Sequence, residues 1–288
     1  MDKALLHTIE AQLGSRVRSC HPISGGDISS AFWLETADTR LFCKFNSGKH
    51  AIAMFRAEKL GLEAIAACGF LNTPEVIFCG QAETGAVLLM EYIEAKNPSP
   101  EDMVLFGEQL ALMHQAPQQQ FGWVQPNFIG RLEQSNNHHP DWPTFYTRER
   151  LLPQMKWAAS GNLLPPGNVP TERQMIEVIT SFCHEVQPSL LHGDLWGGNY
   201  LIAHDGRPYL IDPAVYCGHS EADLAMSKLF GGFSPEFYKG YFRVLGQPEG
   251  FDQRMEIYQL YYLLVHLNLF GGSYFGPVKN ILNTYFRV

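Results

Sequence analysis

The sequence carries little positive charge and no run of basic residues. Among its 288 residues, 21 Lys and Arg stand against 29 Asp and Glu, so the formal net charge is −8 at pH 7. Proteins that bind nucleic acids cluster Lys and Arg to neutralise phosphates, and this chain lacks such clusters. We therefore expect no nucleic-acid partner.

Long apolar runs and paired cysteines are missing as well. The most apolar stretch, residues 257–270, is too short to cross a bilayer and is interrupted by Gln259, His266 and Asn268. The six cysteines show no C-x-x-C spacing, and several lie within apolar runs, as reduced thiols of a cytosolic protein do. The sequence thus predicts a cytoplasmic protein without a membrane partner, and its oligomeric state stays open.

Low-complexity tracts and internal repeats are also absent. Because 45% of the residues are hydrophobic, the chain can build two lobes with cores of their own. In the first third, short β-type runs alternate with turn residues, and one helical pattern spans about residues 50–68. Beyond that third, helical patterns dominate, at residues 100–115, 171–186, 220–230, 234–245 and 252–270.

The change of character falls near residue 95. Pro98 and Pro100 end the preceding strand pattern, Ser99 can cap a new helix, and Asp102 stands where a capping box places an acid. The lobe boundary is therefore predicted at this point.

These patterns predict an α+β fold with two lobes. Residues 1–94 are expected to form a small lobe with an antiparallel sheet, and residues 95–288 a mainly helical lobe. Within the second lobe, residues 117–148 are rich in Pro, Asn, Gln and aromatic residues. We expect them to form an ordered but irregular insertion, whose role the pattern does not reveal.

Polar residues bound three short apolar runs between residues 190 and 212. Asp205-Gly206 predicts a two-residue hairpin loop, in a register that places Asn199 directly opposite Asp212. Two oxygen-bearing side chains so placed can hold a hard cation such as Mg²⁺. Taken singly, each residue is more readily explained as the cap of a turn, and only the opposed pair at the ends of apolar strands favours a cation site.

Asp194 follows the first of these runs, in the sequence His192-Gly193-Asp194. A carboxylate beside a metal-bound phosphate can orient a hydroxyl nucleophile and accept its proton, as in the catalytic loop of kinases. His192 is predicted to brace this loop rather than to carry protons. Asp223, at the start of a later helix pattern, is predicted to cap that helix or to brace the loop.

A candidate phosphate-binding cation, Lys44, lies in the strand pattern of residues 41–45. The helix pattern that follows places Glu58 within an apolar stripe, where a carboxylate requires a partner, and Lys44 is the natural one. Glu58 could instead lie at the edge of the stripe and reach water. Gly25 and Gly26 precede this lysine in a turn without G-x-G-x-x-G spacing, so only the residues that follow identify the turn as a phosphate-covering loop.

With these residues in order, the chain resembles the fructosamine kinase (ketosamine 3-kinase) family, among the aminoglycoside-phosphotransferase-like kinases. The resemblance rests on the motifs LLHGDLWGGNYLI, LIDPAVYCGHSEADLAMSKLFGGF and LYYLLVHLNLFGGSY. It implies a protein-kinase-like bilobal fold and the ATP-dependent phosphorylation of ketosamines at their 3-hydroxyl, a deglycation activity. The implied partner is a small ketosamine or a glycated amine or protein.

The resemblance also assigns roles by position. Asp194 would be the base, and Asn199 and Asp212 would be the Mg²⁺ ligands. Lys44 with Glu58 would position the phosphates of ATP, and residues 1–94 would form the nucleotide-binding lobe. The remaining nucleotide contacts would come from the glycine-rich loop and from the backbone after the last strand of that lobe, namely Gly25, Gly26, Glu91 and Ile93.

The acceptor side is assigned more broadly. Trp196 would stack on the sugar or its aglycone, or else pack within the loop. Four further residues, His219, Glu221, His266 and Asn268, are expected to line the acceptor pocket. A kinase of an aminoglycoside, choline or homoserine-like acceptor is the main alternative, and a nucleotide-binding pseudokinase is a further one.

Overall fold

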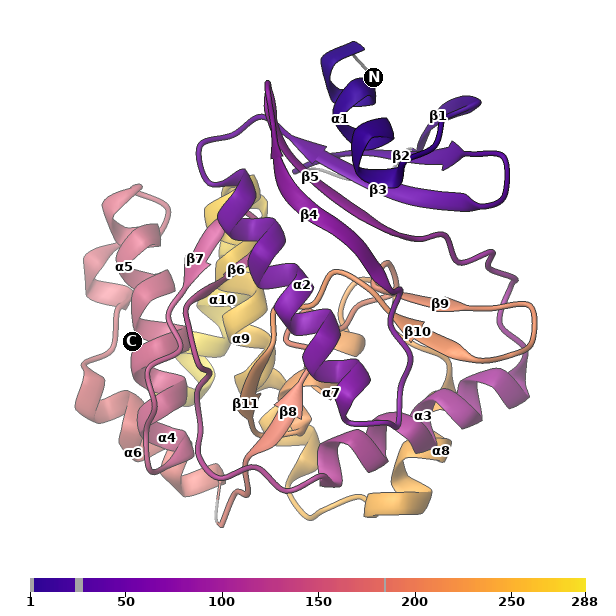
Figure 1. The fold of residues 1–288 in the computed structure, drawn as a ribbon. Coiled ribbons are helices and arrows are strands. Elements are labelled where there is room, and N and C mark those ends of the chain that lie inside the picture. Colours follow the sequence, from indigo (N-terminus) through magenta and orange to yellow (C-terminus); the bar gives the residue numbers. More distant parts are fainter. Residues whose placement is uncertain (1–2, 24–27, 184) are drawn as a thin grey trace.

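A five-stranded antiparallel sheet dominates the first part of the chain in the computed structural model, which describes residues 3–23, 28–183 and 185–288. The strand order is β1-β2-β3-β5-β4, and the sheet lies at the top of Figure 1. Its elements are α1 (Lys3–Leu13), β1 (Ser19–Ile23), β2 (Ser30–Glu35), β3 (Arg40–Asn46), α2 (Ala51–Ala67), β4 (Val76–Ala82) and β5 (Gly85–Glu91).

Both faces of this sheet are covered by a helix. Along β5, successive side chains alternate between the faces, so Val87 and Leu89 pack with Leu5 and Ile9 of α1. Leu88 belongs to the opposite face and packs with the apolar stripe of α2. The strand therefore consists of apolar residues without a polar alternation, as expected where both faces are buried.

The remaining residues form a mainly helical part, at the left and bottom of Figure 1. Its helices are α3 (Pro100–Gln115), α4 (Trp142–Phe145), the π-helix η1 (Tyr146–Leu151), α5 (Leu152–Ser160), η2 (Pro166–Asn168), α6 (Glu172–Phe182), α7 (Glu221–Ser227), α8 (Pro235–Leu245), α9 (Phe251–Phe270), η3 (Gly272–Tyr274), α10 (Phe275–Ile281) and η4 (Leu282–Phe286). Its strands are β6 (Asn127–Ile129), β7 (Leu132–Gln134), β8 (Ser189–Leu191), β9 (Tyr200–Ile202), β10 (Pro208–Leu210) and β11 (Tyr216–Gly218).

Most of the helix predictions are confirmed within a few residues. Helix α3 begins as expected, because the Ser99 side chain accepts from the Asp102 N–H while Asp102 accepts from the Ser99 N–H. Helix α6 ends at Phe182, four residues before the predicted end at residue 186. The irregular insertion contains more regular structure than expected, since β6 and β7 form a short hairpin within it.

The predicted register of the β9–β10 hairpin is wrong by one residue. Pro208 faces Ile202, and the N–H of Ile211 donates to the carbonyl of Asn199 at 3.1 Å, so Asn199 does not face Asp212. The loop has three residues instead of two, and only its glycine, Gly206, adopts a positive φ, of 88°. This is the geometry of a type I turn followed by a left-handed glycine, whereas a type I′ turn requires two positive φ angles.

The segment between the two parts is attached to the second. The N–H of Lys96 donates to the carbonyl of Ile202 at 2.9 Å, and Ala95 forms an isolated bridge with Ala203. The division between residues 94 and 95 stays a prediction. Among the helices of the described residues, none combines the length and apolar character that a membrane crossing requires.

Helices α3 and α8 approach each other so closely that glycine is required at their crossing. A Cβ atom on Gly107 would lie 2.0 Å from the carbonyl oxygen of Phe237, and one on Gly240 would lie 2.1 Å from that of Val104. No side chain fits at such distances, so these two glycines set the separation of the helices.

We expect Gly107→Ala to lower the free energy of unfolding by about 1–3 kcal/mol, because a methyl group in this contact forces the helices apart. The matched control is Gly276→Ala in α10, where a Cβ would meet no atom within 4 Å. That change should alter the free energy of unfolding by less than about 1 kcal/mol, because the gain in helix propensity is opposed by the constraint that Pro277 places on the residue before it. Urea unfolding measures both, and equal effects would contradict the close contact.

Candidate active site

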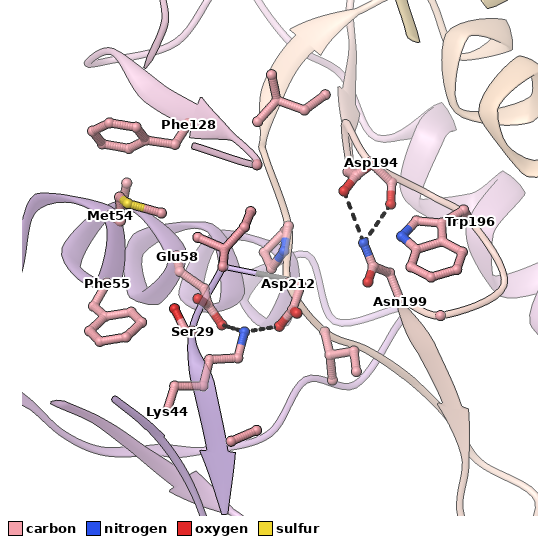
Figure 2. A pocket seen from close by; sticks show the side chains of 18 of the residues that line it. Ser29, Lys44, Met54, Phe55, Glu58, Phe128, Asp194, Trp196, Asn199 and Asp212 are labelled. Carbon is pink, nitrogen blue, oxygen red and sulfur yellow. Dashed lines mark hydrogen bonds and ion pairs between the residues drawn. The ribbon is translucent and has the colours of Figure 1, made fainter. Parts of the chain in front are cut away.

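A cleft of about 1170 Å³ is lined both by the sheet with α2 and by the helical part. Lys44 of β3 and Glu58 of α2 line it together with Asp194, Asn199 and Asp212 of the helical part. Figure 2 shows these five side chains, with Lys44 reaching from its strand toward Glu58 and Asp212. The residues predicted for catalysis and metal binding therefore share one cavity.

Lys44 is held between two carboxylates. It lies in the middle of the sheet, where β3 pairs with both β2 and β5, and its ammonium lies 2.7 Å from Glu58 Oε1. The ammonium also contacts Asp212 Oδ1. The predicted contact between Lys44 and Glu58 is thus present, and the alternative in which Glu58 reaches water is wrong, because only 14% of the Glu58 side chain is exposed.

Burial and the mutual charges of Lys44, Glu58 and Asp212 shift the pKa values of these three residues in opposite directions. Burial would lower the pKa of Lys44, but the charges of Asp212 and Glu58 outweigh it and raise that pKa. Burial also raises the pKa of Glu58, to about 7 in spite of the neighbouring ammonium. For Asp212, burial is outweighed by the attraction to Lys44, so its pKa is lowered. Lys44 thus stays a cation, and Asp212 stays an anion beside it.

Asp212 owes its position to an unusual backbone conformation. Its φ is 55°, in the left-handed region that a residue other than glycine seldom adopts, and Pro213 follows it. The side chain is 42% exposed and lines the cleft. Backbone strain of this kind persists where the surroundings fix it, and it is concentrated at functional sites.

The loop that carries Asp194 is packed directly against the segment after Asp212. Gly193 has a φ of 82°, and a Cβ atom on it would lie 2.1 Å from the carbonyl oxygen of Ala214. His192 is buried, with Nε2 2.9 Å from the carbonyl of Ile211 and Nδ1 3.2 Å from the N–H of Asp194. These partners assign the proton to Nε2, and burial lowers the pKa of the imidazole, so His192 acts as a neutral brace.

Asp223 braces the same loop from the opposite side. Its carboxylate accepts from the N–H groups of His192 and Gly193 at 2.7 and 2.9 Å, and it lies 3.2 Å from His114 Nε2. It does not cap helix α7, whose first residue is preceded by Ser220. Of the two predicted roles for Asp223, the brace is therefore confirmed.

Asp194 and Asn199 are joined by a hydrogen bond across their loop. The Asn199 Nδ2 donates to the Asp194 carbonyl at 2.8 Å and to its carboxylate at 3.1 Å, so the amide oxygen is turned away from Asp194 (Figure 2). Burial and the negative charge of Asp212 raise the pKa of Asp194 to about 7, although this hydrogen bond opposes them. A carboxyl with such a pKa can accept a proton near neutral pH.

The two predicted metal ligands fit a hard cation chemically. The oxygen of Asn199 and the carboxylate of Asp212 line the same cavity, and oxygen donors of this kind suit Mg²⁺. Within residues 3–23, 28–183 and 185–288, no group of three or more His, Cys, Asp or Glu is placed to hold a metal. A cation here would therefore need further oxygens, such as those of phosphates or water.

The other predicted site residues divide between the cleft and the interior. Glu91, Ile93, Trp196 and His266 line the cleft. Gly25 and Gly26 lie outside the described residues. Three of the residues expected in the acceptor pocket, His219, Glu221 and Asn268, are not among the residues that line the cleft.

Those three residues have partners elsewhere. Glu221 forms a bidentate ion pair with Arg254, with both N–O distances at 2.7 Å, in the interior. His219 Nδ1 lies 2.5 Å from the Tyr258 hydroxyl, and Asn268 donates to Gln154. Glu221 lies in the interior because a buried carboxylate requires a cation, and Arg254 supplies one. This partner is distant in the sequence, so the sequence does not reveal it.

The sequence did not identify the polar network behind the β6–β7 hairpin. Asn127 lines the cleft, donates to the carbonyl of Val215 at 2.7 Å, and accepts from Gln134 and Asn136. Gln134 also donates to the carbonyl of Ala214 at 3.2 Å. The network therefore fixes the backbone that follows Asp212. Its amide side chains were visible in the insertion, but no periodicity marked them as buried.

The same hairpin links the two parts of the molecule. Phe128 lies with its ring 6.5 Å from that of His50, at the start of α2, and Glu133 is 4.0 Å from His50 Nδ1. On the other side, Arg131 donates to the carbonyl of Leu269 at 3.1 Å. The insertion thus forms a wall of the cleft between α2 and the end of α9.

A buried lysine–carboxylate pair shares this cleft with Asp194, Asn199 and Asp212. On this two-part fold, the arrangement is that of a phosphotransferase of the protein-kinase-like class. The fold matches that of a thermostable mutant of an aminoglycoside phosphotransferase in a complex with ADP and hygromycin B, at a TM-score of 0.65 and 16% identity, over 98% of this chain and 99% of that chain. The chain belongs to the fructosamine kinase family, whose model matches residues 1–287.

Individual relatives agree with this membership. A probable ketoamine kinase of Enterococcus faecium is 37% identical over 92% of this chain and 94% of its own length. The chloroplastic protein-ribulosamine 3-kinase of Oryza sativa subsp. indica is 34% identical over 95% of this chain and 80% of its own. A crystal structure from Thermobifida fusca, provisionally named fructosamine-3-kinase, has a TM-score of 0.86 and 31% identity, with both chains covered completely.

The Lys44–Glu58 pair should act as a unit in folding. We expect Lys44→Met and Glu58→Gln each to destabilise the protein, and the double variant to lose about 1–3 kcal/mol less than the sum. The reason is that Lys44→Met leaves the buried Glu58 carboxylate without its cation, while Glu58→Gln removes one of the two carboxylates that hold Lys44. Urea unfolding of the four proteins gives the coupling free energy.

The control for this cycle is the exposed pair Lys59 and Glu63 on the same helix, 3.7 Å apart. Changed to Met and Gln in the same way, it should show a coupling of only about 0.3–0.5 kcal/mol. A Lys44–Glu58 coupling as small as that of the control would refute the buried pair.

Proposed function

We propose that the protein transfers the γ-phosphoryl group of ATP to the 3-hydroxyl of ketosamines of the fructosamine or ribulosamine type. The observation that carries the proposal is the convergence of Lys44, Glu58, Asp194, Asn199 and Asp212 on one cleft in a member of the fructosamine kinase family. The rice relative, named protein-ribulosamine 3-kinase, supports the acceptor class.

The nucleotide would lie on the sheet side of the cleft. Apolar side chains of three strands, Ala31, Phe42 and Met90, line the cleft there and suit the faces of an adenine ring. Glu91 and Ile93, where β5 leads into the linker, would meet its edge through their backbone. Lys44 would then lie at the phosphates, where an obligate cation held by two carboxylates can position them.

Asn199 and Asp212 would hold Mg²⁺, which neutralises charge on the phosphates when bound. The amide oxygen of Asn199 is turned away from Asp194, and the Asp212 carboxylate is kept ionised by Lys44, so both can offer oxygen to a cation. Asp212 must then share its charge between Lys44 and the metal. This sharing connects phosphate positioning with metal binding.

Asp194 would orient the acceptor hydroxyl and take its proton. His192, Asp223 and Asn199 hold the Asp194 loop through hydrogen bonds, so the carboxylate is fixed in the cleft before substrate arrives. A preorganised base of this kind reduces the entropy cost of reaching the reactive geometry. As the sugar oxygen forms its bond to the γ-phosphorus, the bond from that phosphorus to the bridging oxygen breaks and ADP leaves, while the proton of the sugar hydroxyl passes to Asp194.

The acceptor would lie on the helical side of the cleft, near Trp196 and His266. Trp196 is 38% exposed, which leaves its ring free to stack on a sugar. A ketosamine carries an amine that is largely cationic at neutral pH, and the acidic chain, with Asp194 in the cleft, favours such a cation. Plain fructose lacks the amine, so we expect it to be a poor acceptor.

We expect Asp194→Asn to retain ATP binding but to lose phosphoryl transfer by about 10²–10⁴-fold, because it removes the proton acceptor with little change in volume. Calorimetry with an ATP analogue and a coupled ADP assay measure the two steps separately. NMR of the product should show phosphate on the 3-hydroxyl. Phosphorylation of an aminoglycoside or choline, without turnover of any ketosamine, would overturn the acceptor assignment.

Asp212→Asn should abolish Mg²⁺-dependent turnover while the protein stays folded. The asparagine side chain has nearly the same size as that of aspartate but lacks the negative charge that binds the metal. The matched control is Asp205→Asn, at the tip of the adjoining hairpin. There the carboxylate accepts hydrogen bonds from the backbone N–H and the side chain of Arg207. Turnover is measured across a Mg²⁺ titration, and folding by circular dichroism. Wild-type activity of Asp212→Asn at saturating Mg²⁺ would refute the ligand assignment.

A further inference from the structure

Four rings at one side of the cleft form a continuous cluster, which we call the outer aromatic group: Phe230, His266, Phe270 and Tyr274. The ring centroid of His266 lies 4.4 Å from that of Phe230, 5.4 Å from Phe270 and 5.2 Å from Tyr274. All four residues line the cleft that holds Asp194. They come from the helical part, so they lie on the proposed acceptor side.

The outer aromatic group leaves a large apolar surface exposed to water, which is energetically unfavourable. Phe230 is 46% exposed and Phe270 is 52% exposed, although both are among the largest apolar side chains. Single exposed apolar residues are common, but a cluster of aromatic rings that lines a cavity marks a binding surface. The rings are therefore available to an occupant of the cleft.

The backbone is strained in a way that presents one of these rings. Phe230 has a φ of 53°, and Gly231 and Gly232 follow with φ angles of 100° and 70°. The left-handed region is unusual for a bulky residue and is seen mainly where structure and function require it. The N–H of Gly232 donates to the carbonyl of Leu229 at 3.1 Å, which closes the turn that holds Phe230 in the cleft.

The charge of the group limits what it can bind. His266 Nδ1 lies 2.8 Å from the carbonyl of Tyr262, which assigns the proton to this nitrogen, and burial lowers its pKa, so the imidazole is neutral. Among the described residues that line the cleft, Lys44 is the only Lys or Arg. An anion against the outer aromatic group would meet no free Lys or Arg of the cleft lining, since Lys44 is already held by Glu58 and Asp212, whereas an alkyl or aryl group, or a cation over a ring face, would be stabilised.

We infer that the outer aromatic group is a subsite for the substituent on the acceptor amine, and that it favours an alkyl or aryl group next to a cationic nitrogen over a carboxylate-bearing one. This inference rests on the proposed function, because it requires a ketosamine whose sugar lies at Asp194. The sugar would be recognised at the reacting centre, and the amine substituent would lie against Phe230 and Phe270. Acceptors with the same sugar would then differ in KM according to the amine.

The test compares three ketosamines that share one sugar and carry N-methyl, N-benzyl or N-carboxymethyl groups. In the wild-type protein, KM should be lowest for the N-benzyl compound and highest for the N-carboxymethyl compound. In Phe230→Gly and Phe270→Ala, the ratio of the N-methyl KM to the N-benzyl KM should fall by about 3- to 10-fold, as expected for losing one aromatic contact. The effect should appear in KM, since this contact binds ground state and transition state alike.

Two features of the design separate binding from folding. Glycine adopts the φ of residue 230 without strain, so Phe230→Gly removes the ring while the turn is kept, and Tm measurements check this. Phe70→Ala removes an aromatic ring of 37% exposure that does not line the cleft, and it should leave the KM ratio at the wild-type value.

The possible outcomes also separate this inference from the proposed function. If the wild-type protein phosphorylates the ketosamines but Phe230→Gly and Phe270→Ala keep its KM ratio, the subsite is refuted and the kinase activity stands. A wild-type preference for the N-carboxymethyl compound would refute the subsite in the same way. If the wild-type protein phosphorylates none of the three compounds with ATP, the proposed function itself fails.

Discussion

One buried ammonium group, that of Lys44, connects the two parts of the molecule. It is attached to the sheet through β3, to α2 through Glu58, and to the helical part through Asp212. Removing this ammonium would leave the carboxylates of Glu58 and Asp212 without their shared cation, and the loss of one member of a buried ion pair costs about 3–5 kcal/mol. The relative placement of the sheet, α2 and the segment that carries Asp212 is therefore maintained by a contact that also lies at the proposed phosphate site.

The aspartates around this contact differ in role because their surroundings differ. Asp212 is kept ionised by Lys44, whereas burial and the charge of Asp212 raise the pKa of Asp194. Asp223 accepts two backbone N–H groups and does not line the cleft. The same side chain is thus an anion in Asp212, a carboxyl with a raised pKa in Asp194 and a brace in Asp223, according to its neighbours.

Local patterns predicted much of this arrangement. The stripe of α2 identified the Lys44–Glu58 pair, and the capping box located the start of α3, because both depend on residues close in sequence or on a single face. The register of β9–β10 was predicted wrongly, since Asp205-Gly206 is compatible with two loop lengths and only the φ angles distinguish them. The partner of Glu221, Arg254, lies 33 residues away, and no local rule indicates it.

The position of the β6–β7 hairpin affects how the cleft can move. In Figure 1 the linker from β5 to α3 runs down the right-hand edge, and the hairpin lies on the left, beside α2. The sheet and α2 are thus attached to the helical part by the covalent linker, by the Lys44–Asp212 contact and, at the hairpin, by the contacts of Phe128 and Glu133 with His50. A wide hinge motion about the linker would break the contacts at the hairpin. Substrate entry should therefore involve a sliding shear of α2 along the hairpin, with a small amplitude, rather than a wide opening of the lobes.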